Sequence, residues 1–252
     1  MTWEDKARAF AALHRPGDPL ILVNIWDAGS ATAVAAAGAK AIATGSSPVA
    51  QAQGFADGER IPIDLALANA ARIVAAVELP VTVDFEGAYA VEPSAAAANA
   101  LRLRETGAVG CNFEDQVIGG EGLHPLRLQA RRIDAIRAAV GDLFFLNART
   151  DLFMKARAED HDTALVDEAL ERAMAFADCG ASGLFVPGLR DLALLERLTA
   201  ASPLPVNVIA FPGSPPPAKF AEAGAARISH GPFPWKQAMA AFTEAAAAAM
   251  RL

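Results

Sequence analysis

Three short apolar segments of this chain each end in two strongly polar residues that stand two positions apart. The first segment reads Val-Thr-Val-Asp-Phe-Glu-Gly-Ala-Tyr over residues 81–89, and the others cover 109–115 and 144–151. Successive side chains of a β-strand point to opposite faces, so residues two apart share one face. The pairs expected to share a face are Asp84 with Glu86, Asn112 with Glu114, and Asn147 with Arg149.

The alternation of apolar strand patterns with helical patterns runs through the whole chain. Strand patterns begin near residues 21, 41, 81, 109, 144, 183, 206 and 227. Strand starts spaced about 20 to 40 residues apart are typical of βα units with parallel strands. Eight such units predict an α/β fold, namely a (β/α)8 TIM-type barrel. This barrel is favoured rather than a doubly wound sheet, whose ligands would cluster at one switch point. The chain has no linker or low-complexity segment, so we expect a single domain over residues 1–252.

Capping and turn residues predict where the helices begin and end. Helices are expected at about residues 3–14, 64–77, 93–106 and 162–178, and one starts at Pro125. Ser30 is expected to cap a helix that stops at Gly38, and the last helix to begin near Trp235. The Gly-Ser-Ser sequence at 45–47 ends the second strand and is expected to lead into a long loop.

The acids at the strand ends predict a divalent-metal site. Burying a carboxylate without a partner is costly, so Asp84, Glu86 and Glu114 at neighbouring strand ends imply a cation. Oxygen ligands of this kind favour Mg²⁺ or Mn²⁺ over zinc. The alternative is a structural ring of ion pairs, but three acids facing Arg149 alone would leave negative charge uncompensated.

Composition limits the partners and the compartment. The net charge of −7 comes without a basic block, which argues against a nucleic-acid partner. No apolar run approaches the roughly 20 residues that span a bilayer, and the N-terminus lacks a signal-peptide pattern. The two cysteines, Cys111 and Cys179, suit a reducing compartment. We therefore expect a cytoplasmic protein that does not interact with a membrane. Cys111 is out of phase with Asn112 and should face the helix layer, so neither cysteine is the expected nucleophile.

In a barrel of this kind the active site forms at the carboxyl ends of the strands. The polar residues predicted there are Ser46, Asp84, Glu86, Asn112, Glu114, Arg149 and Asn207. His124 follows a glycine-rich stretch at 119–122, where it could act in acid–base chemistry or be a solvated loop residue. Both interpretations of His124 remain open at the level of sequence.

Four motifs resemble those of the isocitrate lyase/phosphoenolpyruvate mutase superfamily, in consistent order from Ile21 to Gly231. They read Asp-Phe-Glu-Gly-Ala-Tyr at 84–89, Asn-Phe-Glu-Asp-Gln at 112–116, Asn-Ala-Arg-Thr-Asp at 147–151 and Gly-Leu-Phe-Val-Pro-Gly at 183–188. The resemblance implies a (β/α)8 barrel, dependence on Mg²⁺, and C–C or P–C bond chemistry on 2-oxo or related acids through an enolate. It also implies homo-oligomers, dimers or tetramers, whose last helix is exchanged between subunits.

The resemblance also assigns roles by position. Asp84 matches the direct metal ligand, and Glu86 and Glu114 match residues that hold the metal directly or through water, Glu86 standing where many members have aspartate. The substrate-binding positions that match are Gly45, Ser46, Ser47, Asn112, Arg149 and Asn207. Arg149 corresponds to the arginine on the substrate's oxyanion or leaving group, and Asp57 to a loop aspartate near the site. Arg149, Asp57 and Glu114 are therefore the expected catalytic residues.

The segment Gln116–His124 departs from the superfamily. Isocitrate and methylisocitrate lyases have a Lys-Lys-Cys-Gly-His loop here, and mutases and phosphonopyruvate hydrolases have a loop bearing lysine, threonine or asparagine. This chain has a short glycine-rich segment, expected to form a movable lid. The leading hypothesis is a Mg²⁺-dependent lyase that cleaves a C–C bond of a small 2-oxo or 2-hydroxy carboxylic acid, as in oxaloacetate decarboxylation. The alternatives are a P–C bond mutase or hydrolase and a non-catalytic barrel that binds a small acid.

Overall fold

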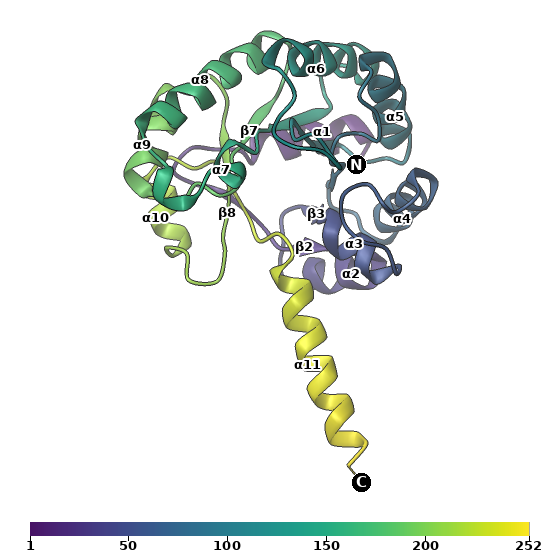
Figure 1. The fold of residues 1–252 in the computed structure, drawn as a ribbon. Helices are drawn as coiled ribbons and strands as arrows, with labels where there is room; N and C mark the ends of the chain where they lie inside the picture. The colour runs from purple at the N-terminus through teal and green to yellow at the C-terminus, as the bar shows by residue number, and fades with distance from the viewer. Residues whose placement is uncertain (252) are drawn as a thin grey trace.

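The computed structural model describes residues 1–251, in which nine parallel strands form one curled sheet surrounded by helices (Figure 1). The order across the sheet is β1-β9-β8-β7-β6-β5-β4-β3-β2. The strands are β1 Leu20–Leu22, β2 Asn24–Ile25, β3 Ile42–Thr44, β4 Val81–Asp84, β5 Gly110–Glu114, β6 Phe145–Arg149, β7 Gly183–Phe185, β8 Val206–Ile209 and β9 Arg227–Ser229. The predicted (β/α)8 barrel is confirmed.

The strand predicted from residue 21 to 26 is broken at Val23, which explains nine strands in eight positions. Its first half, β1, pairs with β9, and its second half, β2, pairs with β3. The Asn24 side chain bridges this seam, because its Oδ1 accepts from the backbone N–H groups of His230 and Gly231 at 3.0 and 2.8 Å. Its Nδ2 donates to the carbonyl of Thr44 at 2.8 Å.

The helices alternate with the strands and cover the outside of the sheet (Figure 1). They are α1 Trp3–Ala12, α2 Ala28–Ala36, α3 Ser46–Ala52, α4 Ile63–Ala76, α5 Pro93–Glu105, α6 Leu126–Val140, α7 Leu152–Lys155, the 3₁₀ turn η1 Ala158–Asp160, α8 Thr163–Asp178, α9 Leu192–Ala201, α10 Pro217–Glu222 and α11 Phe233–Ala249. The prediction that Ser30 caps α2 is wrong. Asp27 is the N-cap, and Ser30 lies three residues on, where the two side chains and backbones form a capping box.

Side chains that point outward from the strands pack in a continuous apolar layer against the helices. Cys111 belongs to this layer together with Ile73 and Leu103, as its phase in the strand predicted. Burial raises the pKa of its thiol to about 12. A thiol in that state is not the reactive thiolate, so Cys111 acts as a small apolar side chain.

Helix α1 closes the end of the barrel where the strands begin. Phe10 from α1 packs against Phe145 and the small strand residues Ala41 and Ala43. His14, just after the helix, stacks on the Phe145 ring with 3.9 Å between centroids, and its Nδ1 lies 2.9 Å from the Phe10 carbonyl. The closed end is therefore apolar, and polar side chains gather toward the other end.

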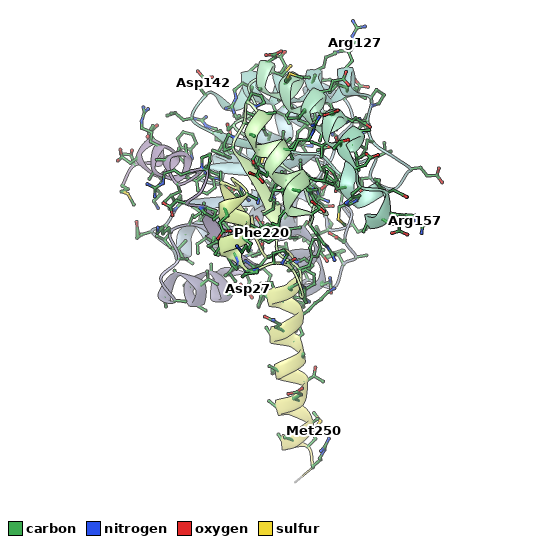
Figure 2. All side chains as sticks on the ribbon, turned by 90° about the vertical axis from the view of Figure 1, so that its left-hand side faces the viewer. Asp27, Arg127, Asp142, Arg157, Phe220 and Met250 are labelled. Atoms are coloured by element: carbon green, nitrogen blue, oxygen red, sulfur yellow. The ribbon has the colours of Figure 1, made fainter. Side chains whose placement is uncertain are left out.

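The last helix, α11, projects away from the barrel with no buried residue (Figures 1 and 2). It begins at Phe233, two residues before the predicted Trp235. Within residues 1–251, no helix is both long enough and apolar enough to cross a membrane.

We predict that His14 makes the fold sensitive to acid. Burial, followed by the charge of Arg227, lowers the pKa of His14 from 6.5 to about 3. Between these values the unfolded chain binds a proton that the native protein does not, so native stability falls as the pH drops through this window, by at most about 1.4 kcal/mol per pH unit. Urea unfolding of His14→Phe and the wild type from pH 7 to 4 should show the wild type losing stability faster. Parallel curves would contradict the assignment.

Candidate active site at the mouth of the barrel

A cavity of about 220 Å³ opens at the carboxyl ends of the strands. One group of lining residues is polar and comes from the β3 to β6 side, namely Gly45, Ser46, Ser47, Asp57, Asp84, Asn112 and Arg149. Seven of the predicted site residues are therefore brought to one place by the fold. The carboxyl ends of the barrel strands are where active sites of this architecture form.

Asp84 lies at the centre of the polar side of this cavity. It is the last residue of β4, and its backbone N–H donates to the Thr44 hydroxyl at 2.9 Å. Its carboxylate accepts from the backbone N–H of Ser46 at 3.1 Å through Oδ2 and from Nδ2 of Asn112 at 3.3 Å through Oδ1. The carboxylate is thus fixed in orientation by the start of helix α3 and by strand β5.

The predicted turn and long loop after β3 are wrong in part, because Ser46 is the first residue of helix α3 and Gly45 is its N-cap. The first N–H groups of a helix have no partner within the helix, so they can donate to acceptors that lie beyond its N-terminal end. The Ser46 N–H already donates to Asp84 in this way. A Cβ at Gly45 would lie only 3.1 Å from Pro48 Cδ, which explains why a glycine occupies the position.

Glu86 reaches the site by a different route from the one predicted. Strand β4 ends at Asp84, and Glu86 has a φ of 50°, in the left-handed region, so the strand-phase argument does not apply to it. The side chain is buried, and its Oε2 accepts from the backbone N–H of Glu59 at 2.8 Å. Burial, with the negative charges of Asp84, Asp57 and Glu114, raises the pKa of Glu86 to about 9.

Glu114 and Arg149 form a buried ion pair with 2.8 Å between Oε2 and Nη1. Arg149 also donates to Asp151 Oδ1 from Nη2 at 2.7 Å, and Gln116 Nε2 donates to Glu114 at 2.8 Å. Burial raises the pKa of Glu114 to about 8, although Arg149 opposes this. Burial works against the charge of Arg149, but Glu114, Asp151 and Asp84 together raise its pKa above the usual value.

Asp57, predicted from the loop after α3, faces the same cavity. Burial and then the charge of Asp84 raise its pKa, while hydrogen bonds from the Ser46 side chain and the Gly58 backbone lower it. The site therefore holds four acids, Asp57, Asp84, Glu86 and Glu114. Asp57, Asp84 and Arg149 line the cavity, and Glu86 and Glu114 are buried beside them.

The four acids offer the carboxylate oxygens that a hard divalent cation prefers. Their carboxylates are not arranged around one point, however. Within residues 1–251, no group of three or more His, Cys, Asp or Glu side chains is placed to hold a metal ion. Glu114 is held by Arg149, and Glu86 by the Glu59 backbone. The raised pKa values of Asp57, Glu86 and Glu114 all include repulsion from Asp84, and a cation beside Asp84 would relieve it.

Four predicted residues do not line the cavity, namely Glu86 and Glu114, which are buried beside it, and Asn207 and His124, which lie farther away. Asn207 is buried beneath the cavity, where its Oδ1 accepts from Asn147 Nδ2 at 3.1 Å. His124 lines a separate cavity of about 190 Å³, with Glu59 and Arg132. The segment 116–124 is a small hairpin, in which Val117 N–H donates to the Gly122 carbonyl at 3.1 Å. Neither Asn207 nor His124 is among the residues that a ligand in the mouth cavity would touch.

Arg227 is the site residue that the sequence analysis missed. It is fully buried on β9, and its Nη2 donates to Asn112 Oδ1 at 3.1 Å. Asn147 Nδ2 donates to the same oxygen at 2.9 Å, so the Asn112 amide must turn its own N–H toward Asp84. The sequence did carry a signal, because Arg227 stands two residues before Ser229 in the eighth strand pattern and alternation turns both into the barrel.

A parallel (β/α)8 barrel with a polar cavity at the carboxyl ends of its strands defines a barrel enzyme. Residues 10–250 match the family model described as phosphoenolpyruvate phosphomutase. The chain belongs to this family, and so to the isocitrate lyase/phosphoenolpyruvate mutase superfamily of lyases and mutases.

The chain is also similar to individual known proteins and structures. A structure from Burkholderia cenocepacia J2315, described as a provisional phosphonomutase, is 49% identical, with a TM-score of 0.94, and the match covers 96% of this chain and 98% of that one. Oxaloacetate decarboxylase of Rhodopseudomonas palustris is 32% identical over 157 residues, which is 58% of this chain and 48% of that protein. Phosphonopyruvate hydrolase, solved as a complex with oxalate and Mg²⁺, shares the fold at 18% identity and a TM-score of 0.85, over 98% of this chain and 87% of that one.

We predict that Glu86 destabilises the metal-free protein as the pH rises. Its pKa in the native state, about 9, lies above the ordinary 4.5, so the native protein keeps a proton that the unfolded chain loses. The stability contributed by that proton is complete below pH 4.5 and disappears as the pH rises toward 9. In EDTA, the free energy of unfolding of the wild type should therefore fall relative to that of Glu86→Gln between pH 5.5 and 8.5. The fall should be at most about 1.4 kcal/mol per pH unit. A constant difference across this range would show that Glu86 is ionised throughout.

Proposed function

We propose that this enzyme is a Mg²⁺-dependent lyase that cleaves a C–C bond of a small 2-oxo or 2-hydroxy carboxylic acid and forms an enolate. The observation that carries the proposal is the group of four acids at the barrel mouth, in which Asp57 and Asp84 line the cavity and Glu86 and Glu114 are buried beside them. The similarity to oxaloacetate decarboxylase, itself a C–C lyase, supports the same reaction type.

Asp84 would hold the metal directly, and Glu86 and Glu114 would hold it directly or through water. When bound, Mg²⁺ would supply positive charge where the enolate oxygen develops its negative charge. Asn112 and Arg227 keep the Asp84 carboxylate in one orientation, which reduces the reorganisation that metal binding requires.

The remaining polar groups would bind the substrate anion. Ser46 and Ser47 lie in the first turn of α3, where backbone N–H groups and hydroxyls can donate to a carboxylate. Arg149 would hold the oxyanion or the leaving group, and its ion pairs with Glu114 and Asp151 keep its guanidinium at the cavity wall. Asp57 faces the cavity beside Asp84 and is placed to exchange a proton with a bound acid.

A second candidate is P–C bond chemistry, which the similarity to the B. cenocepacia structure favours. A phosphonate carries more negative charge than a carboxylate, and Arg149 is already paired with two acids. The cavity charges therefore favour the C–C lyase. Pyruvate release from a panel of 2-oxo and 2-hydroxy acids, measured beside phosphorus NMR on phosphonopyruvate with the same preparation, distinguishes the two reactions.

We predict that Asp84→Asn abolishes Mg²⁺ binding. Loss of the central ligand should weaken binding by more than the roughly 10- to 100-fold that outer ligands contribute. The fold should remain intact, because removing one of four mutually repelling acids relieves repulsion. Calorimetric titration with Mg²⁺ measures the effect, and Asp142→Asn, an exposed acid, is the matched control. Unchanged Mg²⁺ affinity in Asp84→Asn would refute the metal assignment.

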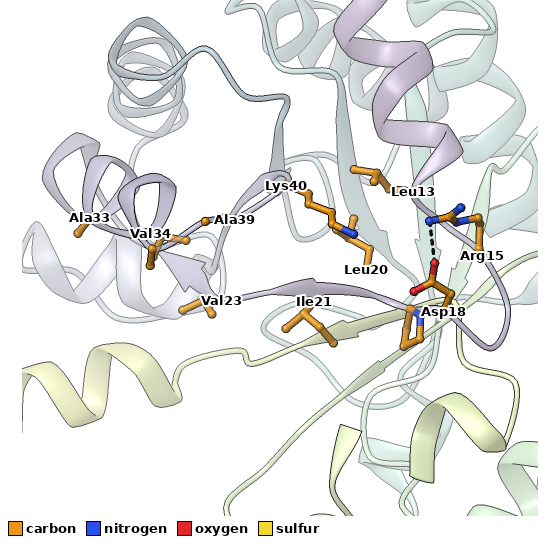
Figure 3. A pocket seen from close by; sticks show the side chains of 13 residues that line it. Leu13, Arg15, Asp18, Leu20, Ile21, Val23, Ala33, Val34, Ala39 and Lys40 are labelled. Carbon is orange, nitrogen blue, oxygen red and sulfur yellow. Dashed lines mark ion pairs between the residues drawn. The ribbon is translucent and has the colours of Figure 1, made fainter. Parts of the chain in front are cut away.

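We also propose that the enzyme is a homo-oligomer, dimer or tetramer, in which α11 is exchanged between subunits. An outward strand residue is normally covered by a helix, yet Ile21 of β1 and Val23, in the break between β1 and β2, are 40% and 37% exposed. They line a groove of about 490 Å³ with Val34 of α2 (Figure 3). Helix α11 carries Phe242 with 69% of its surface exposed, so helix and groove are complementary apolar surfaces.

Phe242→Asp should convert the oligomer to monomers, because a buried charge in an apolar contact costs several kcal/mol. Light scattering after size exclusion measures the mass. Met174→Asp on α8 replaces an apolar side chain of comparable exposure and should leave the mass unchanged. A wild-type monomer, or an unchanged mass for Phe242→Asp, would contradict the exchange.

A further inference from the structure

The mouth cavity has a second wall that is apolar. The apolar residues that form it are Met154, Phe185, Pro187, Ile209, Phe211 and Pro232. Ser229 of β9 is the one polar side chain on this side, and its hydroxyl donates to Asn207 Oδ1 at 3.4 Å. Phe185 ends β7 and Ile209 ends β8, so this wall lies on the β7 to β9 side. In the sheet order, β6 with Arg149 stands between this wall and the acids on β4 and β5. The cavity therefore has one charged end and one apolar end.

The apolar wall is fixed in place by packing. A Cβ on Gly231 would lie 2.4 Å from Ile209 Cδ1, which shows how closely the backbone approaches that side chain. Phe211 packs edge-on against Phe233 with 5.6 Å between ring centroids. Phe185 is buried beneath the guanidinium of Arg149, whose Cζ is 5.7 Å from the ring centroid. These contacts indicate a preformed surface for ligand carbon atoms.

No lysine, arginine or histidine from this side lines the cavity within the described residues. Arg149 already forms ion pairs with Glu114 and Asp151. Arg190 is nearby, but its guanidinium stacks on Phe211 at 4.2 Å from the ring centroid and is not part of the lining. A second carboxylate at this end of a substrate would be buried without a partner, which is costly.

We infer that the substrate is a monocarboxylic 4-hydroxy-2-oxo acid whose remote end is an alkyl or aryl group. Retro-aldol cleavage of its C3–C4 bond balances, because the 4-hydroxyl gives up its proton and becomes the carbonyl of a released aldehyde, and the bonding electrons form the enolate of a 2-oxo acid. The carboxylate and the oxo oxygen lie at the β3 to β6 side, and the apolar end lies on the wall of Phe185, Ile209 and Phe211. This inference rests on the proposed function, because the charged end of the ligand is placed by the acids and Arg149. It narrows that function away from dicarboxylic acids such as oxaloacetate. The cavity of about 220 Å³ suits a short substituent.

Oxamates test the inference, since they imitate a planar enolate and carry a variable group on nitrogen. Calorimetry in saturating Mg²⁺ should compare oxalate, oxamate, N-methyl-, N-ethyl- and N-propyl-oxamate with N-carboxymethyl-oxamate, a diacid that differs in size from the propyl compound by a single heavy atom. Affinity should rise by about threefold to fourfold per added carbon. The propyl compound should bind at least about tenfold tighter than the diacid, which leaves a buried charge unpaired.

Variants locate the effect on the apolar wall. Phe211→Ala should reduce the advantage of N-propyl-oxamate over oxamate by about fivefold, and oxalate affinity should stay within about twofold, because Phe211 touches only the remote end. Phe211→Arg should reverse the preference in favour of the diacid. Met174→Ala, on the outside of α8, is the control and should change neither affinity.

The outcomes separate this inference from the proposed function. If oxalate binds but the diacid binds as tightly as N-propyl-oxamate, the inference is overturned and the metal site stands. Equal loss of oxalate and N-propyl-oxamate binding in Phe211→Ala would also overturn it. If neither oxalate nor any oxamate binds in Mg²⁺, the proposed function fails and the inference fails with it.

Discussion

The mutual repulsion of four neighbouring carboxylates, of which Glu86 and Glu114 are buried, is the constraint on which the rest of this structure depends. Asp57, Asp84, Glu86 and Glu114 are held within one barrel mouth, and burial together with neighbouring charge raises the pKa of three of them. Like charges at short range in a medium of low dielectric repel strongly, so such an arrangement persists only with counter-charges and fixed hydrogen bonds. Arg149 supplies one counter-charge at the cavity wall.

The second counter-charge lies beneath the cavity. Arg227 is buried in a barrel interior that is usually filled by branched apolar residues, and it reaches Asp84 only through the Asn112 amide. That indirect contact leaves the Asp84 carboxylate free of a salt bridge while the positive charge remains close. A direct ion pair would have occupied the oxygens that a cation needs. The polar layer thus positions Asp84 and keeps its carboxylate open to a cation.

Charge is distributed unevenly around the mouth, and this distribution links the fold to the proposed chemistry. The β3 to β6 side supplies the acids, the amide and the arginine, whereas β7 and β8 end in the apolar Phe185 and Ile209. A barrel brings these strands to opposite sides of one opening, so a small ligand contacts both. The same closure leaves the outer side of β1 uncovered, with α11 extended beyond it (Figure 1).

The sequence by itself determined the barrel, the strand positions and most of the mouth, because strand alternation and strand order are local properties of the chain. Asp84, Asn112 and Arg149 follow from them directly. Tertiary structure decided the rest: Glu86 arrives through a left-handed backbone that alternation does not describe, and α3 replaces a predicted loop. Asn207 lies below the cavity, and Arg227 pairs with a residue 115 positions away. Such contacts depend on how the barrel closes, and no local pattern in the sequence carries that information.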